Sequence, residues 1–311
     1  MDRIRLETLK ARGWPAPAVT VGNFDGVHRG HEALVRRAAE WARKHGGEVV
    51  VLTFDPHPVS VVYPDRAPTA LNTLEQKAEL VESLGVDRFV VVPFDEELAL
   101  RPPEAFARGV LAGALEAKKV VVGDNFRFGH DRAGNVTTLA ELGRALGFTV
   151  EALAPVLHEG QPISSSRVRR AIAAGAVDEA AALLGRPYFI DGRVAVGEKR
   201  GRTLGFPTAN LDSANETLPA LGVYAARCRT PTGGWRPAVV NVGQRPTFGG
   251  RLVSVEAHLL DFEGDLYGAE VRLEFQHRLS GEERFAGPEA LAAQIRQDVA
   301  RARDLLGPGS V

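Results

Sequence analysis

The stretch VTVGNFDGVHRGHEALVRRA, Val19–Ala38, predicts a strand, a glycine-bearing loop and a helix in immediate succession. His28 and His31 stand where the helical spacing begins, so both imidazoles lie on the first turn. A helix N-terminus attracts anions, because its free N–H groups and its dipole point at the preceding loop. The glycines of the loop allow tight turns and a close approach of backbone to ligand. This layout indicates a site for nucleotide phosphates.

Outward from this stretch, short apolar runs alternate with stretches of helical spacing from Ala18 to about Ala182. Such alternation is typical of an α/β domain with a parallel sheet and right-handed crossovers. The expected strands are Ala18–Val21, Glu48–Phe54, Arg88–Val92, Lys119–Val122 and Phe148–Leu153. The expected helices are His31–His45, Leu74–Leu84, Pro103–Leu115, Ser165–Ala174 and Asp178–Leu184.

The second half of the chain has a different pattern of apolar and turn residues. From Tyr188 onward it shows strands of period two between Gly, Pro and Asn turns, which predicts an antiparallel β-barrel or sandwich. In Leu252–Asp261 one face carries Val253, Val255, Ala257 and Leu259, and the other carries Ser254, Glu256 and His258. Pro288–Leu306 has the spacing of an amphipathic helix. We expect one domain over residues 1–185 and a second over residues 186–311.

Composition narrows the classes of partner. The chain has 311 residues, enough for two domains, and its 38 basic and 39 acidic residues are interspersed. This balance gives no basic region that would attract nucleic acid or an anionic membrane. No signal peptide and no apolar run of about 18 residues is present, which favours the cytoplasm. The single cysteine, Cys228, excludes an internal disulfide and a Cys-cluster zinc site. Small-molecule partners are expected, and self-association stays open.

The histidine pair has simpler explanations when it is considered alone. Two histidines at this spacing can cap a helix or fill a polar turn. A zinc site is disfavoured, because no cysteine or obvious carboxylate partner stands nearby. The full spacing G-x-F-D-G-x-H-x-G-H fixes more positions than a helix cap, a polar turn or a zinc site requires. It favours nucleotide chemistry.

Two motifs carry a resemblance to a known family. Gly22–Gly26 followed by His28-x-Gly30-His31 resembles the HxGH nucleotidyltransferase signature in the form found in bacterial bifunctional riboflavin kinase/FAD synthetases. GRTLGFPTAN, Gly201–Asn210, resembles the riboflavin kinase hallmark. The resemblance implies a Rossmann-like N-terminal domain that adenylylates FMN to FAD, and a C-terminal β-barrel that phosphorylates riboflavin to FMN. ATP is the implied co-substrate and Mg²⁺ the implied metal.

The resemblance also assigns roles in the first domain. His28, His31 and Arg169 would be catalytic, stabilising charge on the triphosphate, and ISSSRVRR, Ile163–Arg170, looks like the second signature of these enzymes. The implied nucleotide-binding residues are Gly22, Asn23, Phe24, Asp25, Gly30, Ser165 and Ser166. The implied flavin-binding residues, in TFDPHP and GDNFRFGHDRAG, are Phe54, His57, Pro58, Asn125, Phe126, Arg127 and Phe128. Asn125 stands where the family usually has Asp.

In the second domain the resemblance implies that Glu256, in VEAHLLDF, is the base that accepts the proton of the riboflavin 5′-hydroxyl. Thr208 and Asn210 would be magnesium ligands. Gly197, Arg202 and Thr208 would bind nucleotide. No P-loop and no dinucleotide fingerprint occurs in the chain. Near the end, Ser280 stands where a family arginine is expected.

Three rival functions remain at this point. The first is an HxGH nucleotidyltransferase with another acceptor, which the GRTLGFPTAN string disfavours. The second is a monofunctional riboflavin kinase, which intact His28, His31 and Arg169 disfavour. The third is a flavin carrier without turnover, which would leave ATP unchanged.

Overall fold

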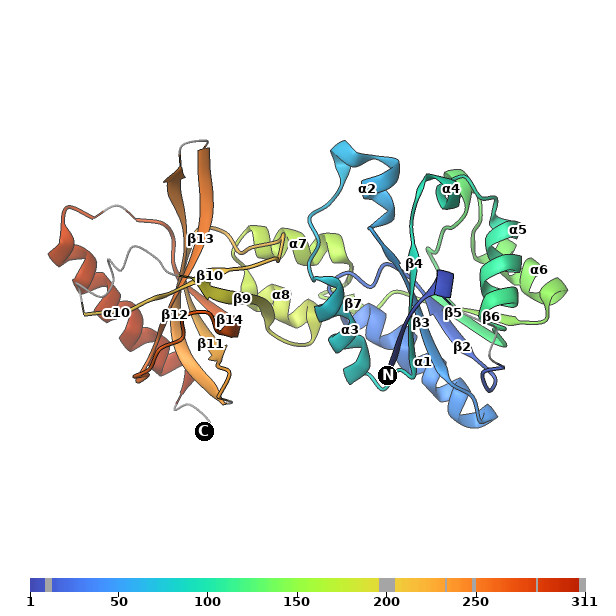
Figure 1. The fold of residues 1–311 in the computed structure, drawn as a ribbon, viewed down its shortest axis with the longest axis horizontal. Helices are drawn as coiled ribbons and strands as arrows, with labels where there is room; N and C mark the ends of the chain where they lie inside the picture. Colours follow the sequence, from blue (N-terminus) through green and yellow to red (C-terminus); the bar gives the residue numbers. More distant parts are fainter. Residues whose placement is uncertain (9–12, 196–204, 233, 248–249, 284, 308–311) are drawn as a thin grey trace. The chain divides into compact units, whose positions relative to one another are not determined.

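The computed structural model describes residues 1–8, 13–195, 205–232, 234–247, 250–283 and 285–307 (Figure 1). These residues form two compact units, Met1–Ser165 and Ser166–Val311. The change of sequence pattern predicts a domain boundary after Gly185, so the predicted and the observed divisions differ over Ser166–Gly185.

The first unit is built on a six-stranded, all-parallel sheet, as its alternating sequence predicts. The strand order is β1-β4-β3-β2-β5-β6. The strands are β1 (Asp2–Arg5), β2 (Ala18–Val21), β3 (Val49–Asp55), β4 (Arg88–Pro93), β5 (Lys119–Gly123) and β6 (Thr149–Leu153). The edge strand β1 was not predicted. A two-stranded ribbon, β7 (Leu157–His158) with β8 (Gln161–Pro162), follows the sheet.

Helices cover both faces of this sheet, because alternate residues of each buried strand point to opposite sides. On one face Ala18, Val49 and Val51 pack with α1 (Arg29–His45) and α3 (Leu74–Ser83). On the other, Val19, Val50 and Leu52 pack with the predicted 103–115 helix and with α6. The remaining helical elements are α2 (Pro58–Val62), α4 (Glu96–Ala99), α5 (Pro103–Phe106), its π-helical continuation (Ala107–Ala114), α6 (Val136–Leu146) and the 3-10 turns Leu6–Thr8, Pro64–Arg66 and His130–Arg132.

The strand order determines where a ligand can bind. The chain runs from β2 to β3 and β4 on one side of β2, and then crosses back to β5 on the other side, so the order of the strands reverses between β2 and β5. Open α/β sheets bind ligands at such a switch point, outside the carboxyl ends of the strands. The loops after β2, β3 and β5 therefore meet at the edge where the sequence motifs lie.

The second unit contains a closed antiparallel barrel of order β10-β13-β12-β11-β14-β9, which decides between the barrel and the sandwich. Inside it lie alternate residues such as Ile190, Tyr224, Cys228 and Leu273, all fully buried. Burial raises the pKa of the Cys228 thiol to about 12, as suits an inert core residue. The strands are β9 (Tyr188–Ala195), β10 (Ala209–Asp212), β11 (Gly222–Arg229), β12 (Trp235–Thr247), β13 (Gly250–Leu259) and β14 (Glu270–Ser280).

The apolar face of β13 is only partly covered. Val255, Ala257 and Leu259 are buried, but Val253, on the same face, is 45% exposed. The pairing of β10 with β13 ends at Val255, so Val253 lies where only the β12–β13 hairpin continues. Periodicity predicts which side chains of a strand share a face. It does not show where the neighbouring strand ends, and so it does not show which of these side chains are covered.

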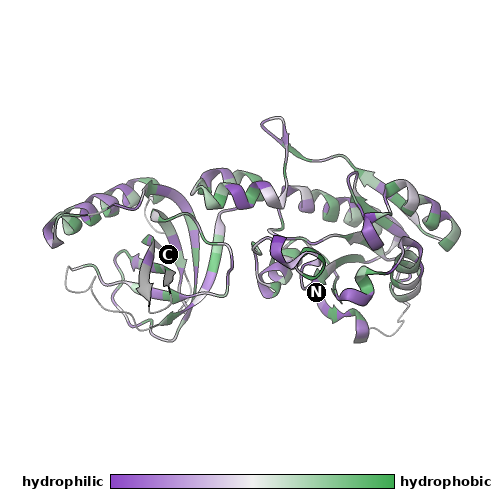
Figure 2. Ribbon diagram, turned by 90° about the horizontal axis from the view of Figure 1, so that it is seen from above, coloured by the Kyte–Doolittle hydropathy of each residue, from purple (hydrophilic) through white to green (hydrophobic). Residues whose placement is uncertain are grey.

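Three helices pack on the outside of the barrel. α7 (Ser165–Ala173) and α8 (Val177–Leu184) are tied to β14, because Arg278 donates to Ala174 O (3.0 Å) and His277 contacts Asp178 at 2.6 Å. These contacts explain why α7, from Ser166 onward, and α8 cluster with the second unit. The terminal helix α10 (Pro288–Leu306) buries Ala302 and Leu306 against the barrel. Figure 2 shows it carrying hydrophobic and hydrophilic residues along its length.

Candidate functional site

His28 and His31 form a reciprocal cap at the start of α1. The His31 N–H donates to His28 Nδ1 and the His28 N–H donates to His31 Nδ1, each at 3.3 Å. Their rings stack with centroids 3.7 Å apart and planes 13° apart. Because each Nδ1 accepts a hydrogen bond, the ring proton of each neutral imidazole resides on Nε2. Both histidines therefore present an N–H donor on the side of the ring away from the cap.

Gly30 is the residue that makes room for this pair. A Cβ placed on it would lie 3.0 Å from His28 Cε1 and 3.1 Å from His28 Nδ1. Carbon atoms in contact normally stand about 3.5–4.0 Å apart, so a side chain here pushes the imidazole away. The glycine of the H-x-G-H spacing is thus explained by contact with the first histidine.

The loop between β2 and α1 is held in an unusual conformation. Phe24 and Val27 have positive φ angles of 47° and 41°, which bulky and β-branched residues rarely adopt. Such residues cost roughly 1–3 kcal/mol each and persist only where the surroundings hold them. Here both side chains are buried in the core. Phe24 is completely buried, so its side chain belongs to the core, and its contact with a nucleotide stays a prediction.

Polar contacts join this loop to three neighbouring segments. Asp25, 3% exposed, accepts a hydrogen bond from the Leu71 N–H at its Oδ1 (2.9 Å), and Ser165 Oγ donates to the Asp25 carbonyl (2.8 Å). The Asn23 carboxamide nitrogen lies 2.9 Å from His57 Nε2. The first motif, the TFDPHP loop and Ser165 therefore converge, as the predicted nucleotide site requires.

The predicted flavin residues bring several aromatic rings together. Phe54 lies near the end of β3, while Phe126 and Phe128 follow β5, and the last two stack with centroids 5.5 Å apart. Phe94 and Phe106, which were not predicted, complete the cluster at 5.6 and 6.3 Å from Phe54. The cluster offers aromatic surface beside the phosphate loop, and contact with a flavin ring stays a prediction.

Other predicted residues of the first domain are less enclosed. Asn125 and Arg127 are exposed, and Arg127 donates to the Phe126 carbonyl (2.9 Å). Pro58 begins α2 behind its N-cap, His57. Ser166 and Arg169 lie in α7, within the second unit, so their part in the nucleotide site stays a prediction.

In the barrel, β10 and β13 bring the predicted kinase residues together. Asn210 is paired directly with Glu256, and Glu256 is paired on its other side with Asn241 of β12. Thr208, just before β10, donates from its hydroxyl to Glu256 Oε2 at 3.4 Å. Paired residues of neighbouring strands point to the same face. One polar row, Asn210–Glu256–Asn241, therefore lies on the outer face of the barrel.

His258 is a residue of this site that sequence reasoning did not single out. Its Nδ1 lies 2.8 Å from the Pro207 carbonyl, and its ring packs edge-on against Phe206 with centroids 5.5 Å apart. It thus fixes the end of the hallmark string to β13. Its place two residues after Glu256, on the same polar face, is the signal that could have found it. The predicted nucleotide contacts Gly197 and Arg202 lie outside the described residues.

Oxygen donors of three kinds meet at this row. Thr208 offers a hydroxyl, Asn210 a carboxamide and Glu256 a carboxylate, the hard ligands that suit Mg²⁺. Among the described residues no group of three or more His, Cys, Asp or Glu side chains could hold a metal ion. The three oxygens of Thr208, Asn210 and Glu256 suit a cation that shares its coordination with water and nucleotide phosphates.

Comparison with known proteins covers both halves of the chain. A family model described as FAD synthetase matches residues 11–167, and one described as riboflavin kinase matches residues 184–306. The bifunctional riboflavin kinase/FMN adenylyltransferase of Escherichia coli (strain K12) is 39% identical over 93% of this chain and 92% of its own length. That of Pseudomonas fluorescens is 41% identical over 94% and 93%. The chain belongs to the bifunctional riboflavin kinase/FMN adenylyltransferase family.

A solved structure supports the fold along nearly the whole chain. The crystal structure described as a macrolide-efflux protein from Streptococcus pneumoniae is 30% identical, with a TM-score of 0.87 over 97% of this chain and 99% of that one. In the part of the chain that the structure describes, every helix is too short or too polar to cross a membrane.

As a member of this family, the enzyme phosphorylates riboflavin to FMN with its C-terminal domain and adenylylates FMN to FAD with its N-terminal domain. This confirms the function and the domain order predicted from the two motifs. Both reactions consume ATP: the first releases ADP and the second releases pyrophosphate. Each domain therefore needs a site for phosphates.

Replacing Gly30 by alanine is expected to reduce kcat/KM for FMN adenylylation by about tenfold to hundredfold, because the new methyl group displaces His28. Initial rates from FMN and ATP measure the loss, and riboflavin phosphorylation by the same sample should stay unchanged. Gly109→Ala is the matched control, since a Cβ there meets nothing within 4 Å. Normal adenylylation by Gly30→Ala would contradict the proposed role of the pair.

Proposed function

We propose that FMN adenylylation takes place where the loops after β2, β3 and β5 meet, with His28 and His31 donating to the triphosphate of ATP. The observation that carries this proposal is the reciprocal cap of the two histidines. That cap leaves both Nε2 atoms as donors at a helix N-terminus, where anions are favoured. The aromatic cluster of Phe54, Phe126 and Phe128 supports a flavin position beside it.

The proposed adenylylation needs no general base. The FMN phosphate has its second pKa near 6, as phosphate monoesters do, so a nucleophilic oxygen is already ionised near neutral pH. One of its oxygens bonds to the α-phosphorus of ATP while the bond from that phosphorus to the α–β bridging oxygen breaks. Pyrophosphate leaves with that electron pair. The protein's part is to hold the groups in line and to stabilise the growing charge with Asn23, His28 and His31.

We propose that the kinase reaction takes place at the Asn210–Glu256–Asn241 row. Glu256 accepts the proton of the riboflavin 5′-hydroxyl as that oxygen bonds to the γ-phosphorus, and ADP leaves with the electron pair of the broken bond. The support is the register that puts Glu256 beside Asn210 and within 3.4 Å of the Thr208 hydroxyl.

Thr208 and Asn210 are the proposed ligands of Mg²⁺ in the kinase site. When bound, the ion neutralises charge on the nucleotide phosphates. Replacing Thr208 by valine, which has the same shape without the hydroxyl, is expected to raise the half-saturating Mg²⁺ concentration of riboflavin phosphorylation about tenfold. Magnesium titrations with riboflavin and with FMN as separate substrates measure the effect. A shift in the FMN reaction alone would contradict the assignment.

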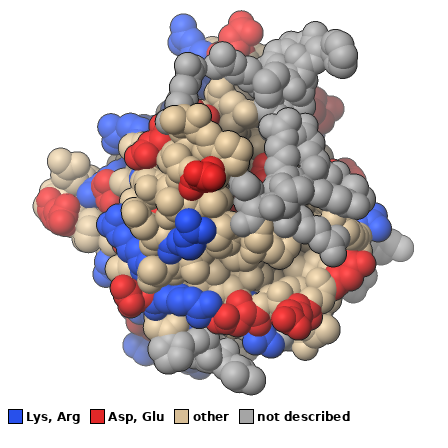
Figure 3. Space-filling model, turned by 90° about the vertical axis from the view of Figure 1, so that its left-hand side faces the viewer, with Lys and Arg blue, Asp and Glu red and all other residues tan. Residues whose placement is uncertain are grey.

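The working partners proposed for the enzyme are small molecules in the cytoplasm, without nucleic acid or membrane. The face drawn in Figure 3 supports this, because basic and acidic side chains are interspersed on it. The whole chain carries 38 basic and 39 acidic residues, which leaves no excess charge to attract a polyanion.

The proposal is tested by incubating the purified chain with riboflavin, ATP and Mg²⁺ and separating the flavins by chromatography over time. Transient FMN followed by FAD is expected, and chelation of Mg²⁺ should stop both steps. FMN alone would confine activity to the barrel. Unchanged riboflavin and ATP would mean a flavin carrier, and the proposal would fail.

A further inference from the structure

The residues just before β10 enter the barrel ahead of the paired register. The pairing of β10 with β13 begins where Ala209 meets Ala257, so Pro207 and Thr208 precede it. Proline has no backbone N–H, and its carbonyl is the one polar group by which it can be held. Side-chain contacts can therefore decide where Thr208, a proposed ligand of Mg²⁺, lies.

Two side chains on the polar face of β13 make such contacts. Glu256 Oε2 accepts from the Thr208 hydroxyl at 3.4 Å, and His258 Nδ1 lies 2.8 Å from the Pro207 carbonyl. Because a carbonyl can only accept, the proton of this bond resides on Nδ1. The first contact is long, since bonds between a hydroxyl and an oxygen are usually about 2.7–2.8 Å. The bond from His258 is therefore the tighter of the two attachments.

The bond from His258 acts on Thr208 through the peptide that joins Pro207 to it. That peptide is planar, so holding the carbonyl oxygen also orients the nitrogen and Cα of Thr208. Threonine is β-branched, and few χ1 rotamers are open to it once its backbone is held. The direction of its hydroxyl thus depends on the Pro207 carbonyl. Mg²⁺ demands nearly ideal octahedral geometry, so a small displacement of a ligand oxygen weakens its binding.

We propose that His258 is a positioning residue of the kinase site, which holds the Pro207 carbonyl and so keeps the Thr208 hydroxyl in place for Mg²⁺ and for Glu256. The inference rests on the proposed kinase site at the Asn210–Glu256–Asn241 row. His258 acts through Thr208, so the loss of its donor should change mainly the magnesium requirement.

The first test replaces His258 by phenylalanine, which keeps a ring beside Phe206 and removes the donor. The half-saturating Mg²⁺ concentration of riboflavin phosphorylation is expected to rise about threefold to tenfold. Magnesium titrations with riboflavin measure the change, and FMN adenylylation by the same samples reports an intact first unit. An unchanged magnesium requirement in a folded His258→Phe variant overturns the proposal.

Two amide variants separate the hydrogen bond from packing. The carboxamide nitrogen of asparagine can take the place of Nδ1, whereas that of glutamine reaches the place of Nε2. His258→Asn should therefore stay within about twofold of the parent requirement, and His258→Gln should behave like His258→Phe. If His258→Phe does not fold, this pair alone decides. Equal magnesium requirements in the two amide variants count against the proposal.

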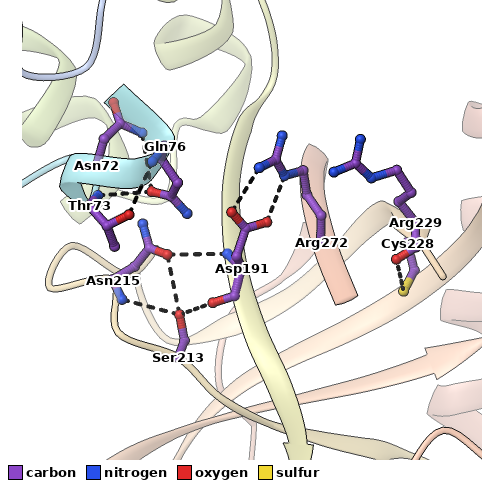
Figure 4. Close-up of polar contacts among 9 residues, drawn as sticks. All are labelled: Asn72, Thr73, Gln76, Asp191, Ser213, Asn215, Cys228, Arg229 and Arg272. Carbon is purple, nitrogen blue, oxygen red and sulfur yellow. Dashed lines mark hydrogen bonds and ion pairs between the residues drawn. The ribbon is translucent and has the colours of Figure 1, made fainter. Parts of the chain in front are cut away.

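The matched control lies at the other end of β10. Ser213 follows this strand directly, and its hydroxyl donates to the Asp191 carbonyl at 2.6 Å, a contact drawn in Figure 4. It is likewise a bond from a side chain to a backbone carbonyl. Ser213→Ala should lower the thermal midpoint and keep the parent requirement for Mg²⁺. If it raises that requirement as much as His258→Phe does, the effect reflects barrel stability and the proposal fails.

A double variant tests whether His258 acts through Thr208. Once the hydroxyl is absent in Thr208→Val, its position no longer matters. Adding His258→Phe to Thr208→Val should therefore raise the half-saturating Mg²⁺ concentration less than twofold further. Effects of the two substitutions that multiply in full would mean that His258 acts elsewhere, and this part of the proposal would be overturned.

The parent chain, Thr208→Val and Glu256→Gln are assayed alongside. If both variants keep normal riboflavin phosphorylation, the proposed kinase site is wrong. If both are impaired as expected while His258→Phe behaves like the parent, only the inference about His258 fails.

Discussion

Replacing Glu256 by glutamine is expected to reduce kcat of riboflavin phosphorylation by about 10²- to 10⁴-fold, with little change in ATP affinity. Glutamine keeps the size and one oxygen of the side chain, so the contact with Thr208 and the pairing with Asn210 can survive. It cannot accept the proton of the 5′-hydroxyl. The substitution should therefore lower kcat rather than ATP affinity.

Steady-state kinetics with riboflavin as the varied substrate measure this loss, and equilibrium binding of ATP checks the affinity. Glu270→Gln is a matched control, because Glu270 is an exposed glutamate on β14 of the same barrel. FMN adenylylation by the Glu256 variant reports an intact first unit. A large loss of ATP affinity with normal turnover would contradict the role of Glu256 as the base.

Replacing His31 by glutamine is expected to reduce kcat of FMN adenylylation by about 10²- to 10³-fold, while the thermal midpoint stays close to that of the parent. Glutamine at this helix position can return the capping bond to the backbone of His28. Gln76 already does so for Thr73 at the start of α3. The substitution therefore keeps the helix cap and removes the imidazole donor.

Initial rates from FMN, together with a thermal melt, separate the two roles of the histidine. The second variant is His28→Asn, since asparagine is a favoured N-cap that also lacks the distal N–H. Both should melt normally and lose activity. Normal adenylylation in either variant would show that the pair serves only to cap α1.

The sequence predicted the elements whose signals are local. Ala18–Val21 and Pro288–Leu306 were predicted to the residue, because apolar periodicity and flanking turns define them. The edge strand Asp2–Arg5 was missed, since DRIR alternates charges and becomes a strand only by pairing with β4. α6 was also missed, although its cap, Asn135, and its terminal Gly147 are readable signals. The π-helical turns of 107–114 have no marker in the sequence.

The residues of the candidate sites also differ in this way: some have a local signal in the sequence, and others are brought together only by the fold. The spacing of His28, Gly30 and His31 is local, and by itself it indicates a phosphate site. Thr208 and Glu256 are 48 residues apart, and only the register of two strands brings them together. Lys77 lies in LEQKAEL, where a lysine normally occupies the solvent face of an amphipathic helix. Its burial depends on tertiary packing.

Asn210, Glu256 and Asn241 form their row through the register of three paired strands, and this has a consequence for how the protein can vary. Removal of one residue from β13 before Glu256 would turn every later side chain of that strand inside out, so the carboxylate would enter the core and Val255 would face water. A strand at an open edge could slide to recover its phase. The closed barrel leaves β13 with a neighbour on each side and prevents such a slip. This strand should therefore tolerate changes of residue type far better than changes of length.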